Sequence, residues 1–204
     1  MDHPCIYLVF SKTGTWLSRL IYLFSRMKYA HTSISFDPTF TQMYSFGRLN
    51  PDNPFSGGFV VENLFGGVFK KFPQCTCMIY KIAVTEEQLL SLQAQVAAFL
   101  NEKEKYRYNL LGLFGVLFNK PLKRKKRYFC SQFVSELLIK SGIYASPKVP
   151  ELIRTSDLFA IENKEIIYEG LVRELPAAYP NLAAVSPVSP PNHPGETSTA
   201  QSRP

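Results

Sequence analysis

The stretch that most constrains the fold is residues 128–138, YFCSQFVSELL, because it predicts a helix that begins at a cysteine. Its apolar residues recur at positions 130, 133, 134, 137 and 138, the spacing of a helix with one buried face. A sulfur in the first turn lies beside unpaired backbone N–H groups and the positive end of the helix dipole, which favour thiolate over thiol. The same N–H groups can hold an oxyanion. Cys130 is therefore a candidate nucleophile; the alternative is a small apolar residue of the core.

A candidate base lies far upstream, at His31. Residues 31–36, HTSISF, alternate polar and apolar with period two and predict a strand. The turn sequence at 37–39 and the run at 41–46 then predict a returning strand, which brings residues 44–46 back beside the imidazole. His3 and His193 lie near the two ends of the chain, so only His31 has a fixed place. Its alternative role is that of a packed or solvated histidine.

The chain of 204 residues is long enough for one well-packed domain and short for two. We expect that domain to cover residues 1–175. From residue 176 the composition changes to Pro, Ala, Ser, Thr and Asn, which cannot offset the entropy of ordering, so residues 176–204 are predicted to be a disordered tail. Other predicted strands cover residues 6–10, 59–64, 75–84 and 166–172, and other predicted helices cover residues 15–27 and 85–105.

Much of the net charge of +7 lies in residues 120–127, directly after the apolar segment 110–118. An apolar segment beside basic residues fits an anionic membrane surface. It equally fits a buried helix followed by a solvated loop, and the shortness of the segment favours this second interpretation. Nucleic-acid binding is not expected, because aromatic residues are not interleaved with the basic ones. The basic residues of this run are Lys120, Lys123, Arg124, Lys125, Lys126 and Arg127.

Several classes of protein are not expected from this sequence. No run of about 18 apolar residues is long enough to span a membrane. The N-terminus lacks the basic region of a signal peptide, so we expect a cytoplasmic protein. Cys75 and Cys77 lie on one face of a predicted strand without a second nearby pair, which is a poor geometry for zinc. We therefore expect neither a metal nor a cofactor.

The order of these features resembles that of a known family. A histidine that begins a strand, a returning strand, and only later a cysteine that begins a helix look like the circularly permuted papain-like amidases of the YiiX type. More distantly, the chain resembles the lecithin retinol acyltransferase family, which shares the order of histidine before cysteine. The resemblance covers roughly residues 6–159, and the stretches that carry it are 6–10, 29–36, 43–47 and 129–134.

The resemblance implies an α+β fold with a permuted papain-like core, in which a small antiparallel sheet packs against the nucleophile helix. Carried over by position, Cys130 is the nucleophile and His31 the general base. The third position, which orients the ring, falls on Tyr44. The families usually place a glutamate or a second histidine there, whereas a tyrosine hydroxyl carries no charge near neutral pH. Ser45 and Glu62 are the alternatives for this role.

The predicted function is that of a cysteine hydrolase acting on an amide or ester through a thioester, with a peptide-like or acyl-containing substrate. Two alternatives stay open. One is a lipid acyltransferase that works at a membrane surface. The other is a binding module that has kept the fold and lost the chemistry, which the uncharged Tyr44 favours.

Overall fold

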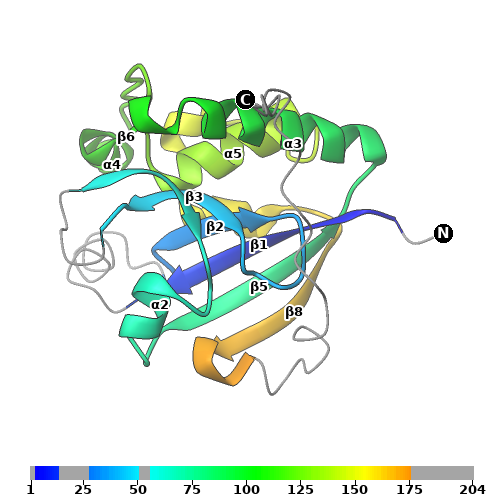
Figure 1. Cartoon of the computed structure of the whole chain (residues 1–204). Helices are drawn as coiled ribbons and strands as arrows, with labels where there is room; N and C mark the ends of the chain where they lie inside the picture. The colour runs from blue at the N-terminus through cyan, green and yellow to red at the C-terminus, as the bar shows by residue number, and fades with distance from the viewer. Residues whose placement is uncertain (1–2, 14–27, 51–55, 176–204) are drawn as a thin grey trace, which may run out of the picture.

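The fold, given by a computed structural model that describes residues 3–13, 28–50 and 56–175, is α+β, as predicted. A six-stranded antiparallel sheet has the order β4-β3-β2-β1-β5-β8 (Figure 1). The predicted helix at 15–27 and the predicted tail lie outside the described residues. The strands of the sheet are β1 (Cys5–Lys12), β2 (His31–Ser35), β3 (Met43–Arg48), β4 (Gly57–Glu62), β5 (Thr76–Ala83) and β8 (Lys164–Leu171).

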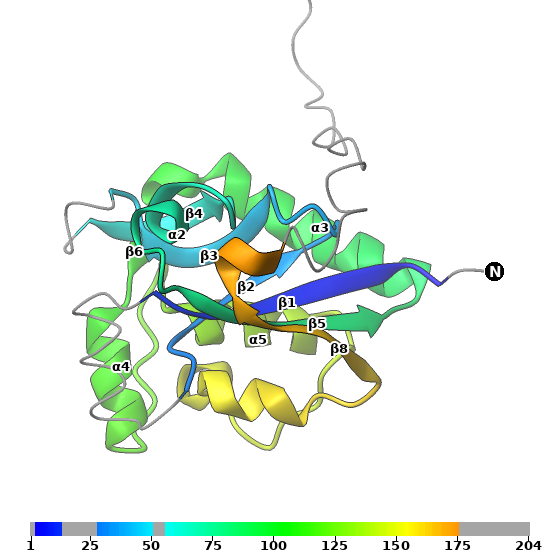
Figure 2. The same cartoon turned by 90° about the horizontal axis from the view of Figure 1, so that it is seen from below.

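Helices cover the sheet unequally on its two sides. The helices α3 and α5 lie over one face, and the short α2 lies on the other side (Figure 1). The helix α4 lies at one end of the sheet, beside β6 (Figures 1 and 2). No helix in the described ranges is long and apolar enough to cross a membrane. The remaining elements are α2 (Gly67–Lys71), α3 (Glu86–Asn101), η1 (Lys103–Lys105), β6 (Arg107–Tyr108), α4 (Leu110–Leu117), β7 (Arg127–Tyr128), α5 (Cys130–Lys140), η2 (Pro150–Leu152), η3 (Thr155–Ala160) and η4 (Val172–Glu174).

The central strand β1 is buried on both faces. Ile6, Leu8 and Phe10 belong to the core under α3 and α5, whereas Tyr7 and Val9 belong to a second core on the opposite face. A strand covered on both sides reads as a continuous apolar run rather than an alternating one. This is why the sequence of β1 shows no polar face.

The start of α3 and the end of α5 lie where the sequence predicts them, whereas α3 ends at Asn101, before the predicted residue 105. At the start of α3, the Thr85 hydroxyl accepts the Gln88 N–H at 3.1 Å, and the Gln88 side chain accepts the Thr85 N–H at 2.9 Å. These reciprocal bonds satisfy two free donors and confirm the predicted capping box. After α5, Gly142 has a φ of 67°, a left-handed value that glycine adopts without strain.

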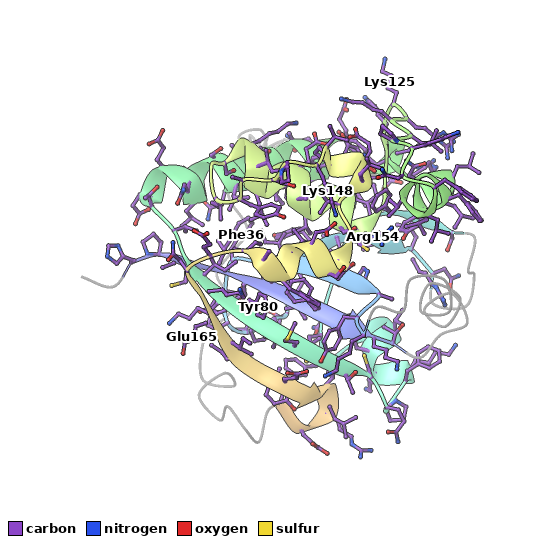
Figure 3. The ribbon with its side chains drawn as sticks, turned by 180° about the vertical axis from the view of Figure 1, so that it is seen from behind. Phe36, Tyr80, Lys125, Lys148, Arg154 and Glu165 are labelled. Carbon is purple, nitrogen blue, oxygen red and sulfur yellow. The ribbon has the colours of Figure 1, made fainter. Side chains whose placement is uncertain are left out.

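The segment between α5 and β8 closes the core on the side of the sheet that α5 covers. The helical turn η3 crosses the sheet there, with Tyr80 of β5 beside it (Figure 3). The rings of Tyr80 and Phe159 meet with centroids 6.2 Å apart. The Ser131 hydroxyl donates to the Ile153 carbonyl at 2.8 Å, so this segment also fixes the first turn of α5.

The favoured interpretation of residues 110–118 as a buried helix is wrong for one side of that helix. The segment does form α4, with Gly112, Gly115 and Val116 buried. Its large side chains face solvent instead. Those exposed by more than a third are Leu110, Leu111, Phe114, Leu117 and Phe118.

Candidate active site

The start of α5 brings Cys130 to the start of β2. The helix packs on β2 and β3, and Cys130, its first residue, is only 3% exposed. The Cys130 Sγ donates toward the backbone carbonyl of Ala30 at 3.8 Å, and Ala30 immediately precedes His31. Two residues that lie far apart in the sequence therefore meet at one edge of the core.

His31 lies between a carboxylate and the thiol. Its Nε2 is 3.0 Å from Oε2 and 3.1 Å from Oε1 of Glu62. Cys130 is the second group that acts electrostatically on the ring. Burial lowers the pKa of His31, but the Glu62 carboxylate and Cys130 raise it more, so the net pKa lies well above 6.5. The ring is therefore able to take a proton and keep it.

Glu62 reaches His31 across the intervening strand. It is the last residue of β4 and lies opposite Met43 of β3, while His31 belongs to β2 on the other side of β3. A Cβ at Gly47 of β3 would lie 3.1 Å from Glu62 Oε1 and 3.5 Å from His31 Cε1. The missing side chain at Gly47 leaves the space in which the carboxylate and the ring meet.

Ser33 fixes the carboxylate from the side. Its hydroxyl donates to Glu62 Oε2 at 2.6 Å and lies 3.2 Å from His31 Nε2. Burial would raise the pKa of Glu62, but the charge on His31 and the hydrogen bonds from His31 and Ser33 bring it below 4.5. Glu62 is thus an anion at neutral pH, and its contact with Nε2 leaves Nδ1 of His31 as the nitrogen that can accept the Cys130 proton.

Tyr44 does not hold the place that its sequence position predicts. Its side chain belongs to the core under α3 and α5, where its ring lies beside Phe36 and Phe59. Its hydroxyl donates to Gln42 at 3.5 Å. Ser45 donates to the Thr32 carbonyl at 2.6 Å. The partner that orients His31 is Glu62, the remaining alternative.

Tyr108 is a further member of the site that the sequence analysis missed. It interacts electrostatically with the Cys130 side chain. Burial raises the pKa of Tyr108 well above 10.0, and Cys130 raises it further, so the phenol stays protonated. Two features place it there. The strand β6 pairs in parallel with β7, which leads into Cys130, and a Cβ at Gly57 would lie only 2.6 Å from the Tyr108 Cβ.

The first turn of α5 has free donors next to the sulfur. Its N-cap residue, Phe129, makes no side-chain capping bond. The first N–H groups of a helix have no partner within the helix. Those at the start of α5 are therefore available to an anion near Cys130.

The other described cysteines differ in surroundings from Cys130. Cys75 and Cys77 are almost completely buried in the second core, and burial raises the pKa of each thiol to about 12. Cys5 is partly exposed at the start of β1. Among the cysteines of the described segments, Cys130 is the one whose side chain acts on the pKa of a histidine.

No family model, no curated protein and no solved structure matches this chain. The chemistry of the site is therefore inferred from its residues and their geometry.

Proposed function

We propose that this chain is a cysteine hydrolase that cleaves an amide or an ester through a thioester on Cys130, and that its core is a permuted papain-like fold. The observation that carries the proposal is the buried row formed by Cys130, His31 and Glu62. A nucleophile, a base and a group that orients the base are the parts that thiol hydrolases require. The order of the histidine strand before the cysteine helix supports the permuted core.

In the first half of the reaction, His31 takes the proton of Cys130, and the thiolate attacks the carbonyl carbon of the substrate. Glu62 holds the other ring nitrogen and stabilises the imidazolium that forms. The tetrahedral intermediate collapses when the bond to the leaving amine or alcohol breaks. The imidazolium gives its proton to that leaving group.

The charge on the intermediate's oxygen falls where donors are available. The N–H groups at the start of α5 supply one set, and the Tyr108 hydroxyl, which stays protonated, supplies another. In the second half, His31 takes a proton from water, which attacks the thioester. The acid product leaves, and Cys130 recovers its proton.

Glu62 weakens the case for a binding module without chemistry. That alternative was favoured by an uncharged residue, Tyr44, in the third position. A charged carboxylate at hydrogen-bonding distance from His31 supports the hydrolase instead. We therefore propose no second function.

The test is a β-lactone probe, which acylates a nucleophilic cysteine to a thioester while its ring opens. Mass mapping should find the adduct on Cys130 ahead of Cys5, Cys75 and Cys77. Cys130→Ala should abolish the adduct, and His31→Ala should slow it by roughly two to four orders of magnitude, the usual contribution of a positioned base.

Cys5→Ala is the matched control, because it removes a partly exposed thiol outside the site and should leave the rate unchanged. An adduct that persists in Cys130→Ala, or a wild-type protein that forms none with any acyl probe, would contradict the hydrolase.

A further inference from the structure

The helix α4 presents large apolar side chains to solvent. Phe118 is 72% exposed, Leu111 53% and Phe114 48%. Positions 111, 114 and 118 lie three and four residues apart, so they share one face of the helix. We call this surface the α4 face; its members are Leu110, Leu111, Phe114, Leu117 and Phe118, with Leu122 beside them. Exposed apolar patches of this kind usually mark an interaction site.

The buried side of α4 is made of small residues, which explains why the large ones point outward. A Cβ at Gly112 would lie 2.5 Å from Asn109 Nδ2, and one at Gly115 would lie 2.5 Å from the Lys120 carbonyl. The helix therefore packs closely on the segment that follows it. Further bonds hold it there, because Asn109 donates to the Leu122 carbonyl at 3.2 Å and Arg154 donates to the Val116 carbonyl at 3.3 Å. The α4 face is thus held rigidly.

Basic residues follow the α4 face in the chain, and acidic residues are absent from this part of the sequence. Residues 106–135 contain no Asp or Glu. Lys120, Lys123 and Lys125 are exposed on the segment that returns from α4. Lys125 projects away from the body of the molecule (Figure 3). The surface therefore combines apolar side chains with exposed lysines; Lys126 of the same run is paired with Glu102 at 2.7 Å, so Lys120, Lys123 and Lys125 supply the positive charge.

We propose that the α4 face docks on the surface of an anionic lipid bilayer. Phenylalanine and leucine side chains enter the boundary between headgroups and acyl chains, while lysines bind the anionic headgroups. An acidic protein would match the charge but not this many unpaired apolar groups, and a nucleic acid offers nothing to the leucines. The helix has 8 residues, too few to cross the bilayer, so it would lie in the plane of the interface.

Docking of this kind places the candidate active site close to the lipid. The helix begins two residues after Tyr108, which interacts electrostatically with Cys130. The docking surface itself needs no catalysis. Its test is therefore separate from that of the hydrolase.

The test is co-sedimentation of the full chain with vesicles of phosphatidylcholine, with or without one third phosphatidylglycerol. The protein should partition onto the anionic vesicles and leave them at high salt. Phe114→Ser with Phe118→Ser should lower the partition coefficient by about tenfold or more, because two large apolar side chains no longer enter the interface. Lys123→Ala with Lys125→Ala should lower it by a similar factor.

Matched controls change side chains of the same kinds elsewhere. Leu90→Ser with Ile166→Ser removes apolar groups that are 62% and 56% exposed on α3 and β8. Lys70→Ala with Lys71→Ala removes two exposed lysines of α2, on the other side of the sheet from α3 and α5 (Figure 1). Both controls should bind vesicles as the wild type does, and thermal melts should show that every variant is folded. Cys130→Ala should also bind, which separates docking from the proposed reaction.

Three outcomes would overturn the proposal. The first is equal or no binding to neutral and anionic vesicles. The second is a loss of binding in the controls as large as that in the α4 variants. The third is a dimer in analytical ultracentrifugation that dissociates in Phe114→Ser with Phe118→Ser, because the partner of the face would then be a second copy of this chain.

Discussion

At the scale of single residues, the site depends on how Glu62 and His31 shift each other's pKa. The His31 side chain is 18% exposed and that of Glu62 17%, so water screens their contact only weakly. Each charge offsets the cost of burying the other. The pair therefore stays ionised over a wider pH range than either group would alone.

This pairing predicts a pH dependence for Glu62→Gln. The folded pKa of His31 is raised, so its contribution to stability is complete below pH 6.5 and is lost as the pH rises through the raised value. The folded pKa of Glu62 is lowered, so its contribution is present above pH 4.5 and is lost as the pH falls through the lowered value. Without the carboxylate, burial alone should bring the pKa of His31 down. NMR titration of the His31 ring measures this directly.

The free energy of unfolding should follow the same rule. The difference between wild type and Glu62→Gln should be largest between pH 4.5 and 6.5, and it should shrink as the pH rises toward the raised pKa of His31 or falls toward the lowered pKa of Glu62. Tyr44→Phe is the control, since its hydroxyl bonds Gln42 and should leave the titration of His31 unaltered. An unchanged pKa of His31 in Glu62→Gln would contradict the pairing.

The sequence predicts two of the site residues because their signals are local. Cys130 begins a periodic helix, and His31 begins an alternating strand. The third residue has no such signal. Its identity depends on which strands are neighbours and on whether the residue between them is small enough to leave room for the contact, as Gly47 is. Tyr44 was assigned by counting along the return strand, and that count cannot show that the tyrosine ring points into the core.

At the scale of elements, β3 lies between the strand that carries the base, His31, and the strand that carries the carboxylate, Glu62. Ser45 and Gly47 are small on the side that Glu62 crosses, whereas Tyr44 and Phe46 fill the opposite core. The strand β3 thus packs large side chains into the core on one face and, on the other, leaves room for the Glu62 carboxylate to reach His31.

Because this room depends on the missing side chain at Gly47, we predict that Gly47→Val slows the reaction of Cys130 without unfolding the chain. Its Cβ would already lie 3.1 Å from Glu62 Oε1 and 3.4 Å from Val60 Cγ2, so a branched side chain must displace the carboxylate. A displaced catalytic group typically costs on the order of tenfold to a hundredfold in rate. The rate of adduct formation and a thermal melt measure the two effects. Gly66→Ala is the control, because a Cβ there would make only ordinary contacts of 3.5 Å or more.

The helix α4 was predicted from the sequence, but the side of it that is buried was not. A segment with apolar residues around its circumference predicts a helix but not its buried side. That side is set by the close packing of Gly112 and Gly115 against the following segment. The strands were predicted more closely, since both cores of the sheet impose the period of two or the continuous apolar run that their sequences carry.

At the scale of the whole molecule, the sheet separates two hydrophobic cores that are covered by different elements. The core under α3 and α5 is covered by long helices. The opposite core is closed partly by the last described residues, where Val172 is 6% exposed and Leu175 1%. The Val172 N–H also donates to the Cys75 carbonyl at 2.9 Å, which ties η4 to the start of β5.

Two truncations therefore have different consequences. A chain that ends at residue 175 keeps η4, and from the composition of residues 176–204 it should unfold at the temperature of the full chain. A chain that ends at residue 171 loses Val172 and Leu175 from the second core. Loss of one buried leucine alone typically costs roughly 2–5 kcal/mol of unfolding free energy, so the loss of both side chains should cost at least that much. Denaturant unfolding of the three chains measures both effects, and a large loss already at residue 175 would mean that the C-terminal segment docks on the domain.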